Sequence, residues 1–267
     1  MNRLTKEQLS KKKGILELYT CIQTEGSKAG FPNILVRFTG CTHRCYFGDG
    51  GFCDSWYTSW SPEKPAFSID DVETMIKENL HIKHLMLTGG SPTMYPEQCN
   101  EIIHLMHKYH GDKAFVTIET EGSHFIATDF KIDLVSLSPK FSNSLPILGT
   151  TTPDGKEVTE NMIGQHEKFR MRYDIISRMI NFHKDYHFKP VWSPGNNKDK
   201  NQEILDEIEE FRRQMNIPFN KTWLMPGGDT REELLKVYPI VMEKCIKLGY
   251  NFTGRPQIIA YDIERGR

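Results

Sequence analysis

The sequence lacks several features that would assign a protein to a class at once. No uninterrupted apolar run approaches the roughly 20 residues that a transmembrane helix needs. The basic N-terminal residues 1–14 are not followed by an apolar segment, so they do not resemble a secretory signal. A formal net charge of −1 gives no sign of a nucleic-acid-binding surface. These absences predict a cytoplasmic protein that binds neither membranes nor nucleic acids.

The chain also lacks any marker that would divide it. It contains no Ser/Gly-rich linker, internal repeat or low-complexity tract, the features that commonly separate domains. A length of 267 residues suits one large domain, as in α/β barrels. We therefore expect a single domain over residues 1–267, with an elaborated and irregular region at about 141–185.

Short apolar segments alternate with segments of helical periodicity. Several apolar segments are continuous, which is typical of parallel strands covered by helices. This order predicts an α/β fold, either a partial or full parallel barrel or a doubly wound sheet. The expected strands are 15–19, 34–38, 84–88, 114–119, 134–138, 187–192, 222–225 and 257–261. The expected helical segments are 68–80, 96–109, 160–183, 200–215 and 231–248.

Two local signals refine these elements. Ser68 is followed three residues later by Asp71, the spacing of a capping box at a helix N-terminus. Pro190 lies inside the expected strand 187–192. Because proline has no N–H for the strand ladder, it indicates an edge or a bulge there.

Three of the six cysteines lie in one Gly-rich loop, residues 38–55. Cys41, Cys45 and Cys53 have the spacing Cys-x3-Cys-x7-Cys, and Cys53 can return toward the other two after the turn GDGG. Three thiolates suit an iron–sulfur cluster with one open iron. A zinc site completed by His43 and a disulfide are the alternatives. The other cysteines are isolated and are expected to be ordinary buried thiols: Cys21, Cys99 and Cys245.

A second motif follows the expected strand 84–88. Gly89, Gly90, Ser91 and Pro92 come directly after this strand, where two glycines allow close approach of a ligand to the backbone. Taken alone, the motif is better explained as a strand-to-helix turn with proline at the helix start. The order of strand, three-cysteine loop, helix, strand and GGSP motif instead favours a functional site at the carboxyl ends of parallel strands.

These motifs resemble those of radical S-adenosylmethionine enzymes, whose usual spacing is Cys-x3-Cys-x2-Cys. The longer gap here is a departure, although Phe52 supplies the aromatic residue expected before the last cysteine. Further segments resemble the 7-carboxy-7-deazaguanine synthase family from about residue 14 to the C-terminus. They are residues 22–26 (IQTEG), 53–55 (CDS), 119–122 (ETEG) and 138–144 (SPKFSNS).

The resemblance implies a modified partial (β/α) barrel of the radical S-adenosylmethionine type. It implies a queuosine-pathway lyase that contracts the ring of 6-carboxy-5,6,7,8-tetrahydropterin to 7-carboxy-7-deazaguanine with loss of ammonia. The implied cofactors are a 4Fe-4S cluster, S-adenosyl-L-methionine and Mg2+. The implied partners are the pterin, an electron donor such as flavodoxin or ferredoxin, and a second copy in a homodimer.

The family also implies roles for individual residues. The metal ligands would be Cys41, Cys45 and Cys53 for the cluster and Ser55 for magnesium. The cofactor-binding residues would be Phe52, Asp54, Gly89, Gly90, Ser91, Pro92, Glu119, Glu121, Ser138, Pro139, Lys140, Met225, Pro226, Gly227 and Gly228. The substrate-binding residues would be Ile22, Gln23, Thr24, Glu25, Arg37, Thr88, Gln257 and Arg267.

Several of these residues have simpler explanations in the sequence alone. Glu25 suits a helix or turn cap, and Arg37 suits a strand arginine that pairs with an acid at the surface. Two other functions remain open at this level. One is a different radical S-adenosylmethionine enzyme, such as an activase of a glycyl-radical partner. The other is a non-enzymatic zinc module, which would leave GGSP and SPK unexplained.

Overall fold

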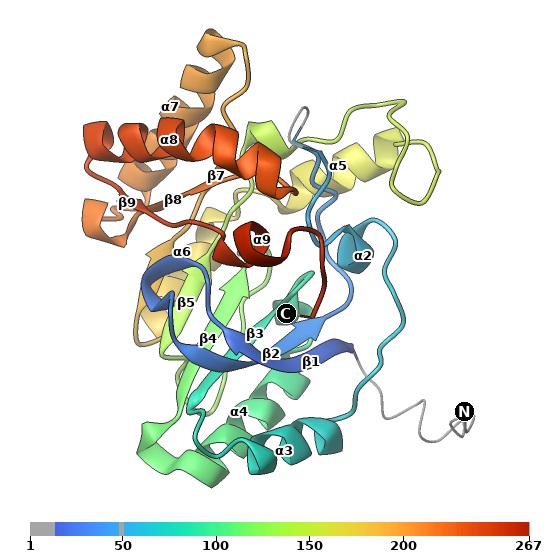
Figure 1. The fold of residues 1–267 in the computed structure, drawn as a ribbon, viewed down its shortest axis with the longest axis vertical. Coiled ribbons are helices and arrows are strands. Elements are labelled where there is room, and N and C mark those ends of the chain that lie inside the picture. The colour runs from blue at the N-terminus through green and yellow to red at the C-terminus, as the bar shows by residue number, and fades with distance from the viewer. Residues whose placement is uncertain (1–13, 48–50, 267) are drawn as a thin grey trace.

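The main layer of the molecule is a sheet whose strands follow one another in chain order (Figure 1). In the computed structural model, which describes residues 14–47 and 51–266, this sheet has six strands. Strand β1 pairs antiparallel with β2, and β2 to β6 are parallel. The bounds are β1 Ile15–Ile22, β2 Pro32–Phe38, β3 His84–Gly89, β4 Phe115–Thr120, β5 Leu134–Leu137 and β6 Tyr186–Phe188.

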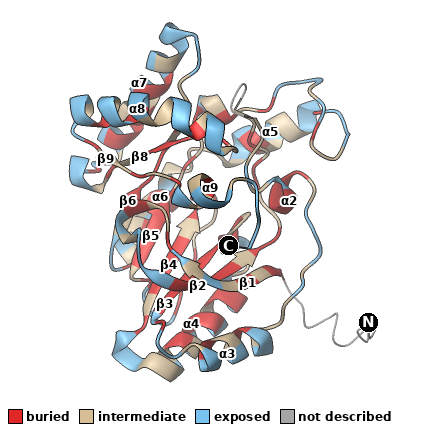
Figure 2. Ribbon diagram, in the orientation of Figure 1, coloured by how far each residue is buried: buried red, intermediate tan, exposed pale blue. Residues whose placement is uncertain are grey.

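Helices α3 (Ile69–Glu78) and α4 (Pro96–His110) lie against this sheet (Figure 1). Their buried residues, such as Val72 on α3 and Ile103 on α4, share one apolar core with strand residues such as Leu85. The strands are mostly buried, while the outer helix surfaces are exposed (Figure 2). The predicted capping box at α3 is confirmed, because Ser68 and Asp71 each accept a hydrogen bond from the other's backbone N–H.

A second, smaller parallel sheet continues the first. Among the described residues it comprises β7 (Val191–Trp192), β8 (Trp223–Pro226) and β9 (Asn251–Phe252). A single bridge between Phe188 and Thr222 links the two sheets. The described strands therefore curve as a partial barrel that does not close, which confirms the predicted fold class. Helices α7 (Lys198–Gln214) and α8 (Arg231–Leu248) accompany this second sheet (Figure 1).

Pro190 explains why one expected strand is divided. The predicted strand 187–192 is split into β6 and β7, and Pro190 lies between them. The Pro190 carbonyl still accepts a hydrogen bond from the backbone N–H of Met225, at 3.0 Å. The proline therefore lies where one sheet gives way to the next.

Two expectations about secondary structure are wrong. Residues 257–261 form no strand but belong to helix α9 (Pro256–Tyr261), where Pro256 occupies the first turn. Proline fits that position, since its missing N–H would have no partner there. The helical run 160–183 is two helices, α5 (Glu160–Phe169) and α6 (Tyr173–Phe182). They are separated at Met171, whose φ of 58° interrupts the helix.

The remaining helical elements are short. Helix α2 (Trp56–Ser59) follows the three-cysteine loop. No helix among the described residues is both long and apolar enough to cross a membrane. The 3-10 turns are η1 (Gly26–Lys28), η3 (Pro92–Met94), η4 (Gly111–Lys113), η5 (Ser142–Ser144) and η6 (Phe219–Lys221).

Candidate functional site

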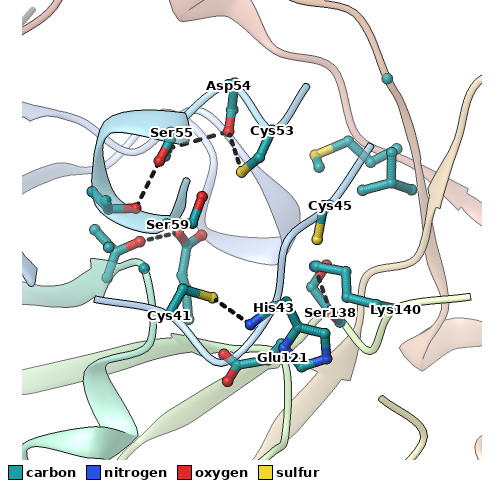
Figure 3. A pocket seen from close by; sticks show the side chains of 18 of the residues that line it. Cys41, His43, Cys45, Cys53, Asp54, Ser55, Ser59, Glu121, Ser138 and Lys140 are labelled. Atoms are coloured by element: carbon teal, nitrogen blue, oxygen red, sulfur yellow. Dashed lines mark hydrogen bonds between the residues drawn. The ribbon is translucent and has the colours of Figure 1, made fainter. Parts of the chain in front are cut away.

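A cavity of about 210 Å³ lies at the carboxyl ends of the parallel strands. The three cysteine side chains enter it from the loop after β2, with Ser138 and Lys140 from the segment after β5 nearby (Figure 3). Many residues with a predicted role line this cavity. They are Glu25, Arg37, Cys41, Cys45, Phe52, Cys53, Asp54, Ser55, Thr88, Gly89, Gly90, Glu119, Glu121, Ser138, Lys140, Met225, Gly227, Gly228 and Gln257.

The cysteine loop folds back on itself, so the long gap does not carry Cys53 away from the other two cysteines. The backbone N–H of Cys53 donates to the Cys45 carbonyl at 3.2 Å. The rings of Tyr46 and Phe52 pack with centroids 4.8 Å apart, and the indole of Trp60 donates to the same Cys45 carbonyl at 2.9 Å. The loop thus presents all three thiols to one cavity.

The three thiols are free, so the disulfide alternative is not supported. Burial raises the pKa of the Cys45 thiol to about 11. Burial, aided by Glu121, also raises the pKa of Cys41, and burial with Asp54 raises that of Cys53. In this environment the thiols stay protonated at neutral pH unless a metal takes the place of the proton.

The cysteines and His43 do not form a ready-made site for a single metal ion in the described structure. Within residues 14–47 and 51–266, no three His, Cys, Asp or Glu side chains converge closely enough to hold one metal ion. The zinc alternative with His43 as fourth ligand therefore has no support. An iron–sulfur cluster needs a different arrangement of ligands. Each thiolate binds its own iron, so the three sulfur atoms need not converge on one point.

His43 lies between the cysteines and carries an unsatisfied nitrogen. Its ring is fully buried and lines the cavity. Nδ1 lies 2.9 Å from the Thr42 hydroxyl, whereas Nε2 has no hydrogen-bond partner in the described part of the chain. Buried polar atoms are normally hydrogen-bonded. An unsatisfied nitrogen beside three free thiols fits a cavity that receives a further group.

The GGSP segment has a structural reason for its glycines. A Cβ on Gly89 would lie 2.3 Å from the Phe38 carbonyl oxygen, and one on Gly90 would lie 2.1 Å from that of Gly40. Gly89 also has a φ of +135°, which side chains rarely adopt. The backbone N–H of Gly90 bonds to Phe38 and that of Ser91 to Gly40, at 2.9 and 2.8 Å. The glycines thus fasten the cysteine loop to the end of β3.

Two acidic side chains, Glu119 on β4 and Glu121 just after it, lie beside this segment. Glu119 accepts a hydrogen bond from the Thr88 hydroxyl at 2.8 Å. Glu121 is buried and accepts from the Ser91 hydroxyl at 2.6 Å. The ammonium of Lys140 donates to the Ser138 carbonyl at 2.7 Å and to its hydroxyl at 3.0 Å. Thr88, Glu119, Glu121, Ser138 and Lys140 line the cavity; Figure 3 shows Glu121 near Cys41 and His43, and Ser138 and Lys140 beside Cys45.

The opposite part of the cavity is a largely buried ionic network, in which the Asp54 side chain is 42% exposed. Lys189 forms an ion pair with Glu25 and lies 3.5 Å from Glu119. The guanidinium of Arg255 pairs with Asp54, and its Nε lies 3.5 Å from Glu25. Burial opposes the ionisation of both acids, but the adjacent cations outweigh it. They lower the pKa of Glu25 and bring the pKa of Asp54 to about 2.

Two further predicted substrate residues belong to this network. Gln257 on α9 donates to Glu25 at 3.0 Å, while its side-chain oxygen has no partner among the described residues. Arg37 on β2 donates to Glu17 at 2.6 Å and to the Ser55 hydroxyl at 3.3 Å. Arg37 therefore pairs with an acid, as its simpler explanation expects, and also faces the cavity.

A second cavity of about 250 Å³ adjoins the first. It lies beneath α9 and residues 261–266 and shares Arg37, Asp54 and Arg255 with the first cavity. Arg265 holds this terminal segment in place. Its guanidinium lies 3.3 Å from the centre of the Tyr57 ring and pairs with Glu17 at 3.1 Å.

Some predicted site residues do not line the main cavity. Gln23 is buried, and its side-chain oxygen accepts from the backbone of its neighbour Thr24 at 3.2 Å. Ile22 points outward and is 51% exposed. Neighbouring residues in extended chain face opposite ways, so a whole motif rarely enters one cavity. The others are Thr24, Ser91, Pro92, Pro139 and Pro226, whereas Arg267 lies outside the described residues.

Three charged residues of the cavity were not predicted: Lys189, Asp229 and Arg255. Lys189 did leave a signal, because a lysine inside the apolar segment HFKPVW needs a buried partner. Arg255 directly precedes Pro256 and Gln257 but matches no motif considered above. Asp229 follows Gly227 and Gly228 and lines both cavities.

Comparisons with known proteins find relatives that match most of the chain. The chain is 30% identical to a 7-carboxy-7-deazaguanine synthase of Rhodopirellula baltica over 94% of this chain and 88% of that protein. It is 29% identical to one of Halobacterium salinarum, with 93% and 90% covered. A crystal structure of QueE from Escherichia coli shares the fold, with a TM-score of 0.55, 18% identity and coverage of 90% and 92%. No protein-family model matches the chain.

Proposed function

The chain belongs to the 7-carboxy-7-deazaguanine synthase family, and we propose how its residues serve that reaction. The enzyme converts 6-carboxy-5,6,7,8-tetrahydropterin to 7-carboxy-7-deazaguanine by a radical S-adenosylmethionine ring contraction that releases ammonia. The observation that carries the assignment to this cavity is that three free thiols, one buried and two half-buried, enter it at the carboxyl ends of the strands. No observation favours a glycyl-radical activase.

We propose that Cys41, Cys45 and Cys53 hold a 4Fe-4S cluster. The donor set fits, because three free thiols without a common focus suit a cluster better than a single ion. Together, the reduced cluster and bound S-adenosylmethionine would supply the radical chemistry that begins the ring contraction. The protein's own contribution is to bind, orient and shield the reactants.

S-adenosylmethionine is proposed to lie between the cysteine loop and the ends of β3, β4 and β5. Its amino and carboxylate groups need acceptors and cations, and the cavity offers Glu121, Ser138 and Lys140 there. Its adenosyl part would lie toward the end of β8, near Met225 and Gly227. There a Cβ on Gly227 would lie 1.8 Å from the Ser193 hydroxyl, so a side chain at this position would displace Ser193. This arrangement would leave the ionic network free for the pterin.

The pterin is proposed to bind at the ionic network. Its ring edge presents hydrogen-bond donors and acceptors, and Gln257 has a buried side-chain oxygen without a partner in the described structure. Glu25 and Thr88 line the same cavity, and Arg37 brings a guanidinium for the substrate carboxylate. Because Glu25, Lys189 and Arg255 already hold one another, these charges would be oriented before substrate binds.

Magnesium is proposed to bind beside Ser55. The Ser55 hydroxyl lies 3.2 Å from the Asp54 carboxylate, so two oxygen donors are adjacent. Hard oxygen donors and substrate oxygens are the ligands that magnesium prefers. Arg37 donates to the same hydroxyl at 3.3 Å, and this contact would have to yield when the ion binds.

The remaining proposals concern assembly and supply. We propose that residues 1–267 act as a single domain, because the cavity is lined by both sheets. An electron donor such as flavodoxin or ferredoxin, a homodimer and a cytoplasmic location remain proposals drawn from the family.

One anaerobic experiment tests the function. The reconstituted protein is incubated with S-adenosylmethionine, a reductant and 6-carboxy-5,6,7,8-tetrahydropterin, and the product is identified by mass spectrometry. We expect 7-carboxy-7-deazaguanine and ammonia in equal amounts. Cleavage of S-adenosylmethionine without conversion of the pterin would support a different radical enzyme, and absence of both reactions would contradict the proposal.

A further inference from the structure

The cysteine loop is held from outside by the elaborated region. Helix α5 places His166 against the loop, and its Nδ1 accepts a hydrogen bond from the backbone N–H of Arg44 at 3.1 Å. Arg44 is the residue immediately before Cys45. The ring of His166 also meets the ring of His43 edge-on, with centroids 4.9 Å apart. One imidazole thus contacts the two residues that lie directly before Cys45.

A chain of hydrogen bonds fixes the protonation of this imidazole. Because Nδ1 accepts from Arg44, a neutral ring carries its proton on Nε2, which lies 3.1 Å from the Ser144 hydroxyl. Ser144 donates in turn to the Phe141 carbonyl at 2.7 Å. Each donor in this series of hydrogen bonds has an acceptor, and His166 and Ser144 are both fully buried. Such a satisfied buried network holds its members in one arrangement.

Ser144 makes a second contact with the loop. Its carbonyl accepts from the backbone N–H of Tyr46 at 3.0 Å, on the other side of Cys45. The chain is therefore held by the elaborated region at positions 44 and 46, the two neighbours of this cysteine. A residue held on both sides has little freedom to move its thiol.

The elaborated region is itself anchored to helix α7. Arg170, next to α5, pairs with Glu207 at 3.0 Å. The other oxygen of Glu207 accepts from the backbone N–H of Ser142 at 3.0 Å. One carboxylate thus fixes both ends of the segment that carries Ser144 and His166, so the support is continuous from α7 to the cysteine loop.

We propose that His166 and Ser144 form a brace that positions the Cys45 segment to receive the iron–sulfur cluster. These two residues touch the loop backbone and not the cluster, so His166 is a positioning residue. The inference rests on the proposed cluster and assigns a role to the region 141–169. Without His166, the N–H of Arg44 would be left buried and unpaired, and the loop would relax to satisfy it.

The structure supplies a matched control in His183. It is also buried, accepts from the backbone N–H of Ile132 at 3.3 Å, and has its Nε2 3.2 Å from the Ile126 carbonyl. It therefore makes the same kind of contacts as His166, but with residues outside the cysteine loop. His183→Ala should lower the stability of the fold without loosening the cysteine loop.

The test compares the reconstituted parent protein with His166→Ala, His166→Asn and His183→Ala. We measure the rate at which a ferrous chelator removes iron under anaerobic conditions, and the electron paramagnetic resonance spectrum of the reduced cluster. His166→Ala should lose iron about tenfold faster and show a broadened spectrum, because one buried N–H loses its acceptor. His166→Asn, which keeps an acceptor near the position of Nδ1, should recover much of the parent's retention.

The outcomes separate this inference from the proposed function. Equal iron retention in His166→Ala and the parent would overturn the brace while leaving the cluster intact. Equally fast loss in His183→Ala would also overturn it, since general destabilisation would then explain the effect. A parent protein that takes up no cluster would overturn the proposed function and this inference with it.

Discussion

The two sides of the main cavity differ in whether their polar groups already have partners within the protein. The sulfur wall, formed by Cys41, His43, Cys45 and Cys53, holds protonated thiols and a buried nitrogen without a partner among the described residues. The ionic wall, formed by Glu25, Asp54, Lys189 and Arg255, has its charges paired with one another. The sulfur wall therefore has groups that still need a binding partner, whereas the charges of the ionic wall already have theirs.

This difference indicates the order in which the site is built. A buried ion pair is costly to disrupt, so the ionic wall helps to hold the fold before any ligand arrives. Free thiols add little to folding by themselves and gain their role when they bind metal. We therefore expect substitutions in the sulfur wall to abolish chemistry with little effect on folding. Substitutions in the ionic wall should affect stability as well.

The largest effect is expected from the cysteines. Cys41→Ala, Cys45→Ala and Cys53→Ala should each abolish cleavage of S-adenosylmethionine, because a cluster with only two thiolates is not held. Iron content and cleavage are measured after anaerobic reconstitution. The parent should bind about four irons per chain.

Three other cysteines serve as controls for this prediction. Cys21→Ala, Cys99→Ala and Cys245→Ala should keep both iron and cleavage activity, because these thiols do not line the cavity. Full activity in Cys53→Ala would show that the cluster does not span the long gap between Cys45 and Cys53.

Arg255→Met is the most direct way to disrupt the ion pairs of the ionic wall. The substitution removes the buried guanidinium that pairs with Asp54 and lies 3.5 Å from Glu25; because the Asp54 side chain is 42% exposed, the expected loss is about 1–3 kcal/mol. Urea unfolding of the metal-free protein measures this loss. Arg213→Met is the control, because Arg213 is largely exposed and pairs with an exposed Glu210. The control should change stability by less than about 0.5 kcal/mol, and an equal loss in both variants would contradict the comparison.

Arg37→Ala separates substrate binding from cofactor binding. Loss of a buried cation opposite the substrate carboxylate should cost on the order of 2–5 kcal/mol, and hence orders of magnitude in pterin turnover. Affinity for S-adenosylmethionine and iron content are measured in the same preparation and should be unchanged. If cofactor binding fell together with turnover, Arg37 would serve the fold through Glu17, which it contacts at 2.6 Å.

A smaller effect is expected at the proposed magnesium site. Ser55→Ala should slow pterin turnover and reduce its stimulation by added magnesium, because one oxygen ligand is removed. Iron content should stay at the parent level. Equal magnesium stimulation in Ser55→Ala and the parent would show that Ser55 only forms the turn before α2.

Local patterns predicted the elements and the sulfur wall well. The bounds of α8 agree with the predicted 231–248, and β3 was predicted within one residue. The cysteines, Gly89 and Lys140 also enter the cavity that their motifs indicated. These features depend on residues close in sequence, where periodicity and spacing carry the information. The error at α9 arose because six residues are too few for periodicity to distinguish a strand from a helical turn.

The ionic wall was harder to predict for a physical reason. Lys189 and Glu25 are 164 positions apart, and Arg255 and Asp54 are 201 apart. Such pairs depend on how the two sheets meet, which no local pattern encodes. The sequence indicated Glu25 and Asp54 only through the resemblance to a family, and Lys189 and Arg255 were missed.

The last prediction uses Asp229, which lines both cavities and has a pKa shifted in the opposite direction to that of Asp54. Burial and then the nearby Asp54 carboxylate raise the pKa of Asp229 to about 7. In the unfolded chain this group ionises near pH 4. Between these values the folded protein binds the proton and the unfolded chain does not, so this group's contribution to stability falls as pH rises from about 4 to about 7.

Asp229→Asn keeps the shape of the side chain but cannot ionise, so it removes the free-energy cost of the buried carboxylate at high pH. The variant should therefore match the parent near pH 4 and exceed its unfolding free energy at pH 8, by on the order of 1 kcal/mol after allowance for the partial exposure of the group. The contributions of groups that titrate alike in variant and parent cancel when the two unfolding free energies are subtracted. Urea unfolding at the two pH values provides the measurement. A difference that stays constant with pH would show that Asp229 ionises in the folded protein as it does in the unfolded chain. A variant less stable than the parent at pH 8 would show that the Asp229 carboxylate is stabilised in the folded protein and that the ionic wall extends to it.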